Sequence, residues 1–400
     1  VEGSYDASQA TPGVALSLGD DDSRAVAIPF AFPYYGKTYS TIYVNSDGNL
    51  TFTGGDASTE SRSVGRLTSG APRIAPLFHD MDPTKAGASI RSLASAERLV
   101  ISWVAVPQFQ SFGTGAPQTF QVRLYPNGRI EIAYDTVAAA DAVVGIAPGH
   151  LQGVPNLVKF RTPSPTEYSG AIAERFSSAE SIDLTFAAQR FYETHDDAYD
   201  YLAVYNNLNI DADIGAVAYA LTYRSAVTGN GDAVLDIAAD AGSPRRLQTL
   251  MNMGQLSQYS TDPNGNVPKR GTTGDTPLSI IGHEAGHRFL SYASVVDPVT
   301  EGKPMLSFDG AHWAFTFNSE ASLMQGNRIR DNGAGATPRF LTTGTVEGYA
   351  PLDLYLMGLQ PPHEVPGSFY VTNATVSSSA LPLRGTGFDG TRHDVTVDDL

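Results

Sequence analysis

The chain has 400 residues, more than one hydrophobic core usually encloses, so we expect more than one domain. Its formal net charge of −16 argues against nucleic acid and anionic membranes as partners, because both select basic surfaces. Cysteine is absent, which excludes disulfides, thiol catalysis and thiolate metal ligands.

No run approaches the roughly 20 apolar residues that a membrane-spanning helix needs. Val1 begins without a charged region and an apolar region, so we see no signal peptide and expect a processed or excised chain. Residues 398–400 form no evident closing element, and we expect the protein to continue after them. An acidic, cysteine-free composition rich in Gly, Thr, Ser and Asp is typical of a secreted or cell-surface bacterial protein.

Residues 1–160 carry the pattern of an all-β sandwich. Short runs that are alternating or rich in β-branched and aromatic residues predict strands at 41–44, 50–52, 99–103, 120–125 and 130–134. The Asn- and Gly-containing stretches 45–49 and 126–128 predict hairpin turns, because these residues accept positive φ at low cost.

Three motifs in this region follow one another in a recognisable order: IPFAFPYYG at 28–36, VNSDGNLTF at 44–52 and IAPLFHDMDP at 74–83. Together with the hairpin at 126–128 they resemble the nidogen-like extracellular domain over roughly the first 150 residues. The resemblance implies an adhesive or accessory β module without chemistry of its own. His79, Asp80 and Asp82 fit a polar loop end better than a cation site.

Residues 161–182 contain Pro, Ser and Thr and predict a linker. Beyond it, residues 183–400 mix helix and strand signals, which indicates an α+β domain whose C-terminal end is truncated. Helices are expected at 187–192, 245–253, 277–291 and 349–359, and strands at 201–205 and 216–223.

Residues 282–287, GHEAGH, match the H-E-x-x-H motif. Residues four apart lie on one face of a helix, so His283 and His287 can bind one zinc ion at ~2.0–2.1 Å. Glu284 would then face a water in the open coordination position and act as general base.

The surroundings of the motif predict a helix. Thr276 is a suitable N-cap and Pro277 fits the first helical position. Gly286 interrupts the helix at a cost of about 1 kcal/mol relative to Ala, and we expect it to permit a close approach near the ion. The expected apolar face consists of Leu278, Ile281, Ala285 and Phe289.

A catalytic zinc needs three protein ligands and an open position. The candidates for the third ligand are His312, Asp353, Glu320, Glu347 and His363.

His312 is followed by Trp313 and, twelve positions later, by Met324. This order resembles the leishmanolysin-type metzincins. The resemblance implies that His283, His287 and His312 bind zinc, that Glu284 is the base and that Met324 lies beneath the histidines. The chain departs from ordinary metzincins at Leu290, where those proteins have Gly, and from leishmanolysins in having no cysteine.

Asp353 is the rival third ligand, because a carboxylate from a later helix would give the gluzincin arrangement. Its structural alternative is a helix-start carboxylate that accepts backbone N–H groups near Pro351. Tyr292, Tyr349 and Tyr355 are candidate oxyanion donors. The acidic Gly turns 229–232 and 331–335 could hold structural calcium, although ordinary Asx turns account for them more readily.

The sequence therefore predicts a secreted zinc endopeptidase that acts on protein or peptide substrates through a zinc-activated water, with an N-terminal β module for targeting or adhesion. Two alternatives remain: a non-catalytic extracellular binding protein, and a metal-dependent hydrolase of another amide.

Overall fold

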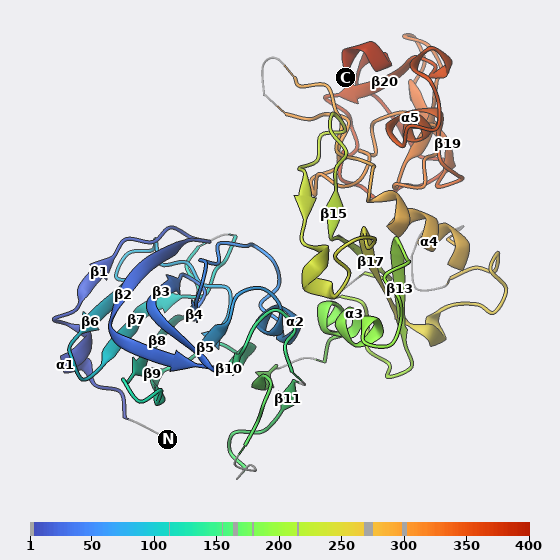
Figure 1. Ribbon diagram of the computed structural model, residues 1–400. Helices are drawn as coiled ribbons and strands as arrows, with labels where there is room; N and C mark the ends of the chain where they lie inside the picture. Colours follow the sequence, from blue (N-terminus) through green and yellow to red (C-terminus); the bar gives the residue numbers. More distant parts are fainter. Residues whose placement is uncertain are drawn as a thin grey trace. The chain divides into compact units, whose positions relative to one another are not determined.

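The computed structural model describes residues 4–111, 113–153, 155–162, 167–177, 180–213, 216–267, 275–297 and 302–400 (Figure 1). The chain forms two compact units. The N-terminal unit comprises Val1–Asp196 and Ala239–Ser243, and the C-terminal unit comprises Asp197–Ala238 and Pro244–Leu400.

The N-terminal unit contains two sheets. One has five strands in the order β1 (Val14–Leu16), β6 (Ser89–Ala94), β7 (Leu99–Pro107), β8 (Pro117–Leu124), β9 (Ile130–Thr136). The other has seven, in the order β11 (Asn156–Leu157), β12 (Ile172–Phe176), β10 (Ala142–Ala147), β5 (Arg73–Phe78), β4 (Asn49–Thr51), β3 (Lys37–Asn45), β2 (Ser23–Tyr34). Helices α1 (Ala7–Ala10), α2 (Val64–Thr68) and α3 (Leu184–Tyr192) belong to the same unit.

The two sheets share one hydrophobic core, which confirms the predicted β domain. Ile42 and Phe52 come from the seven-stranded side, and Trp103 and Phe120 come from the five-stranded side; all four are fully buried. The predicted hairpin turn contains Gly48 at φ +64°, where a Cβ would lie 2.1 Å from the Leu77 carbonyl oxygen, so this turn requires glycine.

The predicted boundary at residue 160 and the linker at 161–182 are wrong. Strand β12 pairs antiparallel with β10, from Ala142↔Phe176 to Ile146↔Ile172, so this stretch is part of the sheet. Helix α3 then packs on α2, where the Gln189 side chain donates to the Gly65 carbonyl at 2.8 Å. The proline-containing residues 163–166, and also 178–179, lie outside the described residues.

The C-terminal unit is built of several small sheets. A three-stranded sheet has the order β13 (Tyr201–Asn206), β17 (Thr249–Gln255), β14 (Tyr219–Thr222). The others are β15 (Arg224–Ser225) with β16 (Leu235–Asp236), β18 (Asn327–Asp331) with β19 (Phe340–Thr345) and β21 (Gly387–Phe388), and β20 (Ser368–Thr372) with β22 (Thr391–Val395). Helices α4 (Pro277–Gly286) and α5 (Pro351–Leu356) belong to this unit.

Short 3₁₀ helices occur at η1 (Ala238–Ala241), η2 (Leu256–Gln258), η3 (Pro362–Glu364) and η4 (Val397–Asp399). In the part of the chain that the structure describes, no helix has both the length and the apolar character needed to cross a membrane.

The predicted helix at 245–253 is wrong, because Thr249–Gln255 is the central strand β17. It pairs parallel with β13 and antiparallel with β14, and Leu250 and Met253 are fully buried. A strand that is covered on both faces lacks the period-2 alternation that would have identified it. The other predictions for this region correspond to β13, which is one residue longer than predicted, and to β14, α4 and α5, which are shorter.

Phe52→Ala tests the shared core of the N-terminal unit. Removing a fully buried aromatic side chain should lower the free energy of unfolding of this unit by about 3–5 kcal/mol. Phe160→Ala, at a side chain that is 46% exposed, is the matched control and should change it by less than about 1 kcal/mol. Urea titration of the whole protein checks this, and equal midpoints for the two variants would contradict the described core.

Candidate metal centre

Helix α4 begins as its sequence predicts. The Thr276 hydroxyl accepts from Ser279 N at 3.0 Å and the Ser279 hydroxyl accepts from Thr276 N at 2.8 Å, which forms a capping box with Pro277 at the start. The helix ends at Gly286, with His287 as C-cap, rather than at 291. Ile281 and Ala285 pack into a core with β17, whereas Leu278 is 59% exposed and does not contribute to the predicted apolar face.

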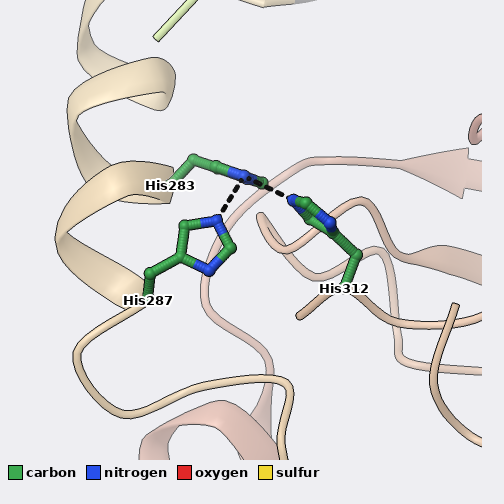
Figure 2. Close-up of side chains that lie close together, drawn as sticks. All are labelled: His283, His287 and His312. Atoms are coloured by element: carbon green, nitrogen blue, oxygen red, sulfur yellow. Dashed lines mark hydrogen bonds between the residues drawn. The ribbon is translucent and has the colours of Figure 1, made fainter. Parts of the chain in front are cut away.

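The side chains of His283, His287 and His312 converge, as Figure 2 shows. His283 Nε2 lies 3.2 Å from His287 Nε2 and 3.1 Å from His312 Nε2. Two nitrogen ligands of one tetrahedral zinc, each at 2.0–2.1 Å, are roughly 3.3 Å apart. The spacing of the three nitrogens therefore fits one small cation.

The hydrogen bonds of two of these imidazoles determine where their protons lie. His283 Nδ1 is 2.7 Å from the Leu323 carbonyl oxygen, and His312 Nδ1 is 2.7 Å from Asp309 Oδ2. Both oxygens only accept, so each Nδ1 must carry the hydrogen, and in the neutral ring Nε2 is left with a bare lone pair. Two lone pairs 3.1 Å apart repel each other unless a cation lies between them.

His312 lies in a short hairpin. Leu306 and Trp313 form an antiparallel bridge, and Ser307 N donates to the His312 carbonyl at 2.8 Å. Asp309, within the turn, has its pKa lowered to about 2, chiefly by the hydrogen bond from His312. It is therefore a carboxylate at neutral pH, and it orients the imidazole whose Nε2 faces His283.

Met324 lies against α4 and is fully buried. A Cβ on Gly286 would lie 2.7 Å from Met324 Sδ, so the glycine inside the motif permits this close approach. Trp313 N donates to the Met324 carbonyl at 3.0 Å, and Leu323 supplies the carbonyl that accepts from His283. The segment around Met324 therefore supports both the helix and the His312 hairpin.

Asp353 is not among the residues that converge with the histidines. It is fully buried, and it accepts from Trp313 Nε1 at 3.0 Å and from Ala350 N at 2.8 Å. Burial raises its pKa. These contacts match the helix-start alternative for Asp353, and they also tie the start of α5 to the residue next to His312.

The remaining ligand candidates have other surroundings. Glu320 and Glu347 both form ion pairs with Arg328, at 3.0 and 2.7 Å, and His363 is exposed on η3. None of these three belongs to the histidine group among the described residues.

Glu284 and the tyrosines surround the same helix. Glu284, next to His283, is only 2% exposed. The Tyr349 hydroxyl donates to the Gly282 carbonyl and the Tyr292 hydroxyl donates to the His287 carbonyl at 2.7 Å. Burial raises the pKa of both phenols to about 12. These two tyrosines hold the backbone of the motif, whereas Tyr355 is half-buried on α5.

A second acidic cluster lies in the N-terminal unit, where Asp21, Asp47 and Asp80 come from three separate loops. The Arg62 guanidinium contacts all three, at 2.5, 2.6 and 3.1 Å, and so supplies the positive charge that this cluster needs. The sequence does not reveal this cluster, because its members are far apart along the chain. Asp82, beside Asp80, pairs with Lys85 at 2.8 Å.

The two Gly turns that could hold calcium behave as ordinary turns. Asn230 Oδ1 accepts from Asp232 N at 3.2 Å, and Asp331 Oδ1 accepts from Gly333 N at 2.8 Å. Asp331 also pairs with Arg339 and Arg392, both at 3.1 Å, so its negative charge is already neutralised.

Comparisons with known proteins bear on the N-terminal unit. Residues 1–187 match the family model described as NIDO related. This supports the resemblance to nidogen-like domains, and the match reaches β12 and α3, beyond the predicted boundary at 160. No curated protein and no solved structure was found to match the chain. All residues of the candidate metal centre lie after the matched stretch.

Asp353→Ala tests the structural role of this carboxylate. At least one buried donor, the Trp313 indole or the Ala350 amide, loses its acceptor, so the C-terminal unit should lose about 1–3 kcal/mol of stability. Asp262→Ala, at an exposed turn aspartate whose side chain accepts only from Asn264 N in the contacts described, should change it by less than about 0.5 kcal/mol. The measurement is chemical denaturation followed by tryptophan fluorescence, and an unchanged Asp353→Ala transition would rule out this role.

Proposed function

We propose that the protein is a secreted or cell-surface zinc-dependent endopeptidase, in which the C-terminal unit is a zincin-like catalytic unit and the NIDO-related region targets it to a partner. The observation that carries the proposal is the convergence of three imidazoles on one point, with His283 and His312 each held by an acceptor at Nδ1. The match of residues 1–187 supports an extracellular setting.

The donor set fits zinc. Neutral imidazole nitrogen is a preferred zinc ligand, and three such ligands leave one coordination position open, as catalytic sites require. Carbonyl and carboxylate partners at the far ring nitrogens are the usual supports for metal-binding histidines. The chemistry that zinc supplies at such a site is polarisation of the scissile carbonyl and a lowered pKa of water.

Glu284 would carry the proton transfers. It follows His283 on α4, within the last turn of the helix, and its side chain is shielded from solvent. A carboxylate here can accept a proton from the attacking water and deliver it to the leaving amine. His283, His287 and His312 would hold the ion, and Met324 and Gly286 set how closely the supporting segment approaches α4.

A sheet beside α4 also favours a peptidase. The helix packs against β17 and against the edge strand β14, which runs antiparallel to β17. An edge strand offers free backbone groups that an extended peptide can pair with. This arrangement supports a polypeptide substrate over a small amide.

The competing proposal is a non-catalytic extracellular binding protein. Its support is the NIDO-related match, which covers the N-terminal unit and lies outside the histidine cluster. Hydrolysis of another amide is a third reading, in which the metal is kept and the substrate changes. A chelator-sensitive assay on unfolded protein substrates separates the peptidase from the other two functions: cleavage that the chelator abolishes supports the peptidase, and its absence supports the binding protein or hydrolysis of another amide.

Glu284→Gln should fold, retain zinc and lose hydrolysis by about 10²–10⁴-fold, because the amide cannot take the proton from water. Glu364→Gln, at an exposed residue of η3, is the matched control and should keep full activity. Steady-state cleavage of an unfolded protein, with zinc content measured on the same samples, checks the prediction. Undiminished cleavage by Glu284→Gln would remove Glu284 from the mechanism.

His312→Ala should lose most of the bound zinc, whereas Asp353→Ala should retain it, because His312 faces the other two histidines and Asp353 does not. Elemental analysis after dialysis, on samples with matched folded fractions, makes the comparison. Full zinc occupancy in His312→Ala together with loss in Asp353→Ala would favour the gluzincin arrangement over the one proposed.

A further inference from the structure

We propose that Asp309 is a positioning residue, which holds His312 in the neutral tautomer whose Nε2 is free to bind a metal ion. This inference rests on the function proposed above, because it concerns the same centre. It assigns a role to a residue that the H-E-x-x-H motif does not contain.

The Asp309–His312 contact fixes a proton. The distance from His312 Nδ1 to Asp309 Oδ2 is 2.7 Å, and a carboxylate can only accept, so the imidazole hydrogen lies on Nδ1. A neutral histidine side chain in water favours the other tautomer, with its hydrogen on Nε2. Asp309 therefore reverses the intrinsic preference of His312 and leaves Nε2 free to face His283.

The turn itself holds Asp309. Its Oδ1 accepts from Ala311 N at 3.1 Å, while Gly310, at φ +67°, donates its N–H to the Ser307 carbonyl at 3.0 Å. The two carboxylate oxygens thus have separate tasks: one closes the turn and the other orients the imidazole. The Asp309 side chain is 34% exposed and that of His312 is 16% exposed, so the pair lies at the edge of the centre.

His312 needs this support more than His283 does. His283 is buried on α4, and its Nδ1 is satisfied by the Leu323 carbonyl, which no side-chain substitution removes. His312 belongs to a hairpin loop, and in the hydrogen bonds described its Nδ1 partner is the Asp309 side chain. One substitution at Asp309 therefore changes the tautomer of His312 and leaves the Nδ1 contact of His283 in place.

Asp309→Asn is the informative variant. The amide oxygen can keep the turn contact to Ala311 N, while the amide nitrogen replaces the oxygen that faced His312. That nitrogen only donates, so His312 Nδ1 must become the acceptor and its hydrogen moves to Nε2. Asp262→Asn is the matched control, since Asp262 Oδ1 also accepts from the residue two positions on, at 2.9 Å, in an exposed turn.

The test combines ¹⁵N imidazole spectra of the zinc-free whole protein with zinc dissociation constants from chelator competition. The His312 signals are assigned by their loss in His312→Ala. We expect the Nδ1–H tautomer at His312 in the unaltered protein and in Asp262→Asn, and the Nε2–H tautomer in Asp309→Asn. Zinc should bind Asp309→Asn about 10–100-fold more weakly than either.

An Nε2–H tautomer at His312 in the unaltered zinc-free protein would overturn the inference. This outcome needs no variant, so it does not depend on whether Asp309→Asn folds. Equal tautomers and zinc constants within twofold in Asp309→Asn and Asp262→Asn would also overturn it. Failure of the unaltered protein to bind zinc would instead defeat the proposed function, while the tautomer comparison would still decide the role of Asp309.

Discussion

The C-terminal unit brings two imidazole nitrogens to face each other 3.1 Å apart, and in the neutral rings neither of them carries a hydrogen. Each ring carries its hydrogen on Nδ1, where His283 donates to the Leu323 carbonyl and His312 donates to the Asp309 carboxylate. Such an arrangement stores repulsion unless a cation occupies the space between the lone pairs. Helix capping, the tight turns and the buried carboxylate of this unit all serve to hold these rings in place.

Four stretches that are distant along the chain meet at this point. Helix α4 supplies His283 and His287, and the hairpin bridged at Leu306 and Trp313 supplies His312. The segment with Leu323 and Met324 contacts both, and Asp353 ties Trp313 to the start of α5. Backbone carbonyls and buried side chains supply most of these contacts, so the fold itself holds the imidazoles in place.

The sequence pattern predicted those elements that depend on neighbouring residues, such as strands with alternating burial and capped helix starts. Alternation in half-buried strands located the N-terminal β domain, and Thr276 with Pro277 located the start of α4. The pattern failed for elements whose conformation depends on tertiary burial or on pairing with distant strands. Strand β17 is covered on both faces and so has no alternation, and β12 became a sheet strand although its surroundings resemble a linker.

The same distinction applies to the centre. The i, i+4 spacing of His283 and His287 is local geometry, so the sequence predicts their convergence directly. His312 required a resemblance, since the 24 residues between His287 and His312 give no geometric information. Asp309 was missed, although an aspartate three residues before a histidine with Gly310 between them is a recognisable turn. The choice between Asp353 and His312 as third ligand required the buried contacts of both side chains, which the sequence does not give.

The residues that match the NIDO-related model and the residues of the histidine centre lie in different units. The proposed metal centre belongs to the C-terminal unit alone, where three imidazoles would hold one ion. X-ray absorption of the zinc-loaded protein measures this directly. We expect one zinc per chain, with three imidazole nitrogens at about 2.0–2.1 Å and a light-atom ligand in the remaining position. A spectrum that shows fewer than three imidazoles, or a protein that retains no zinc, would contradict it.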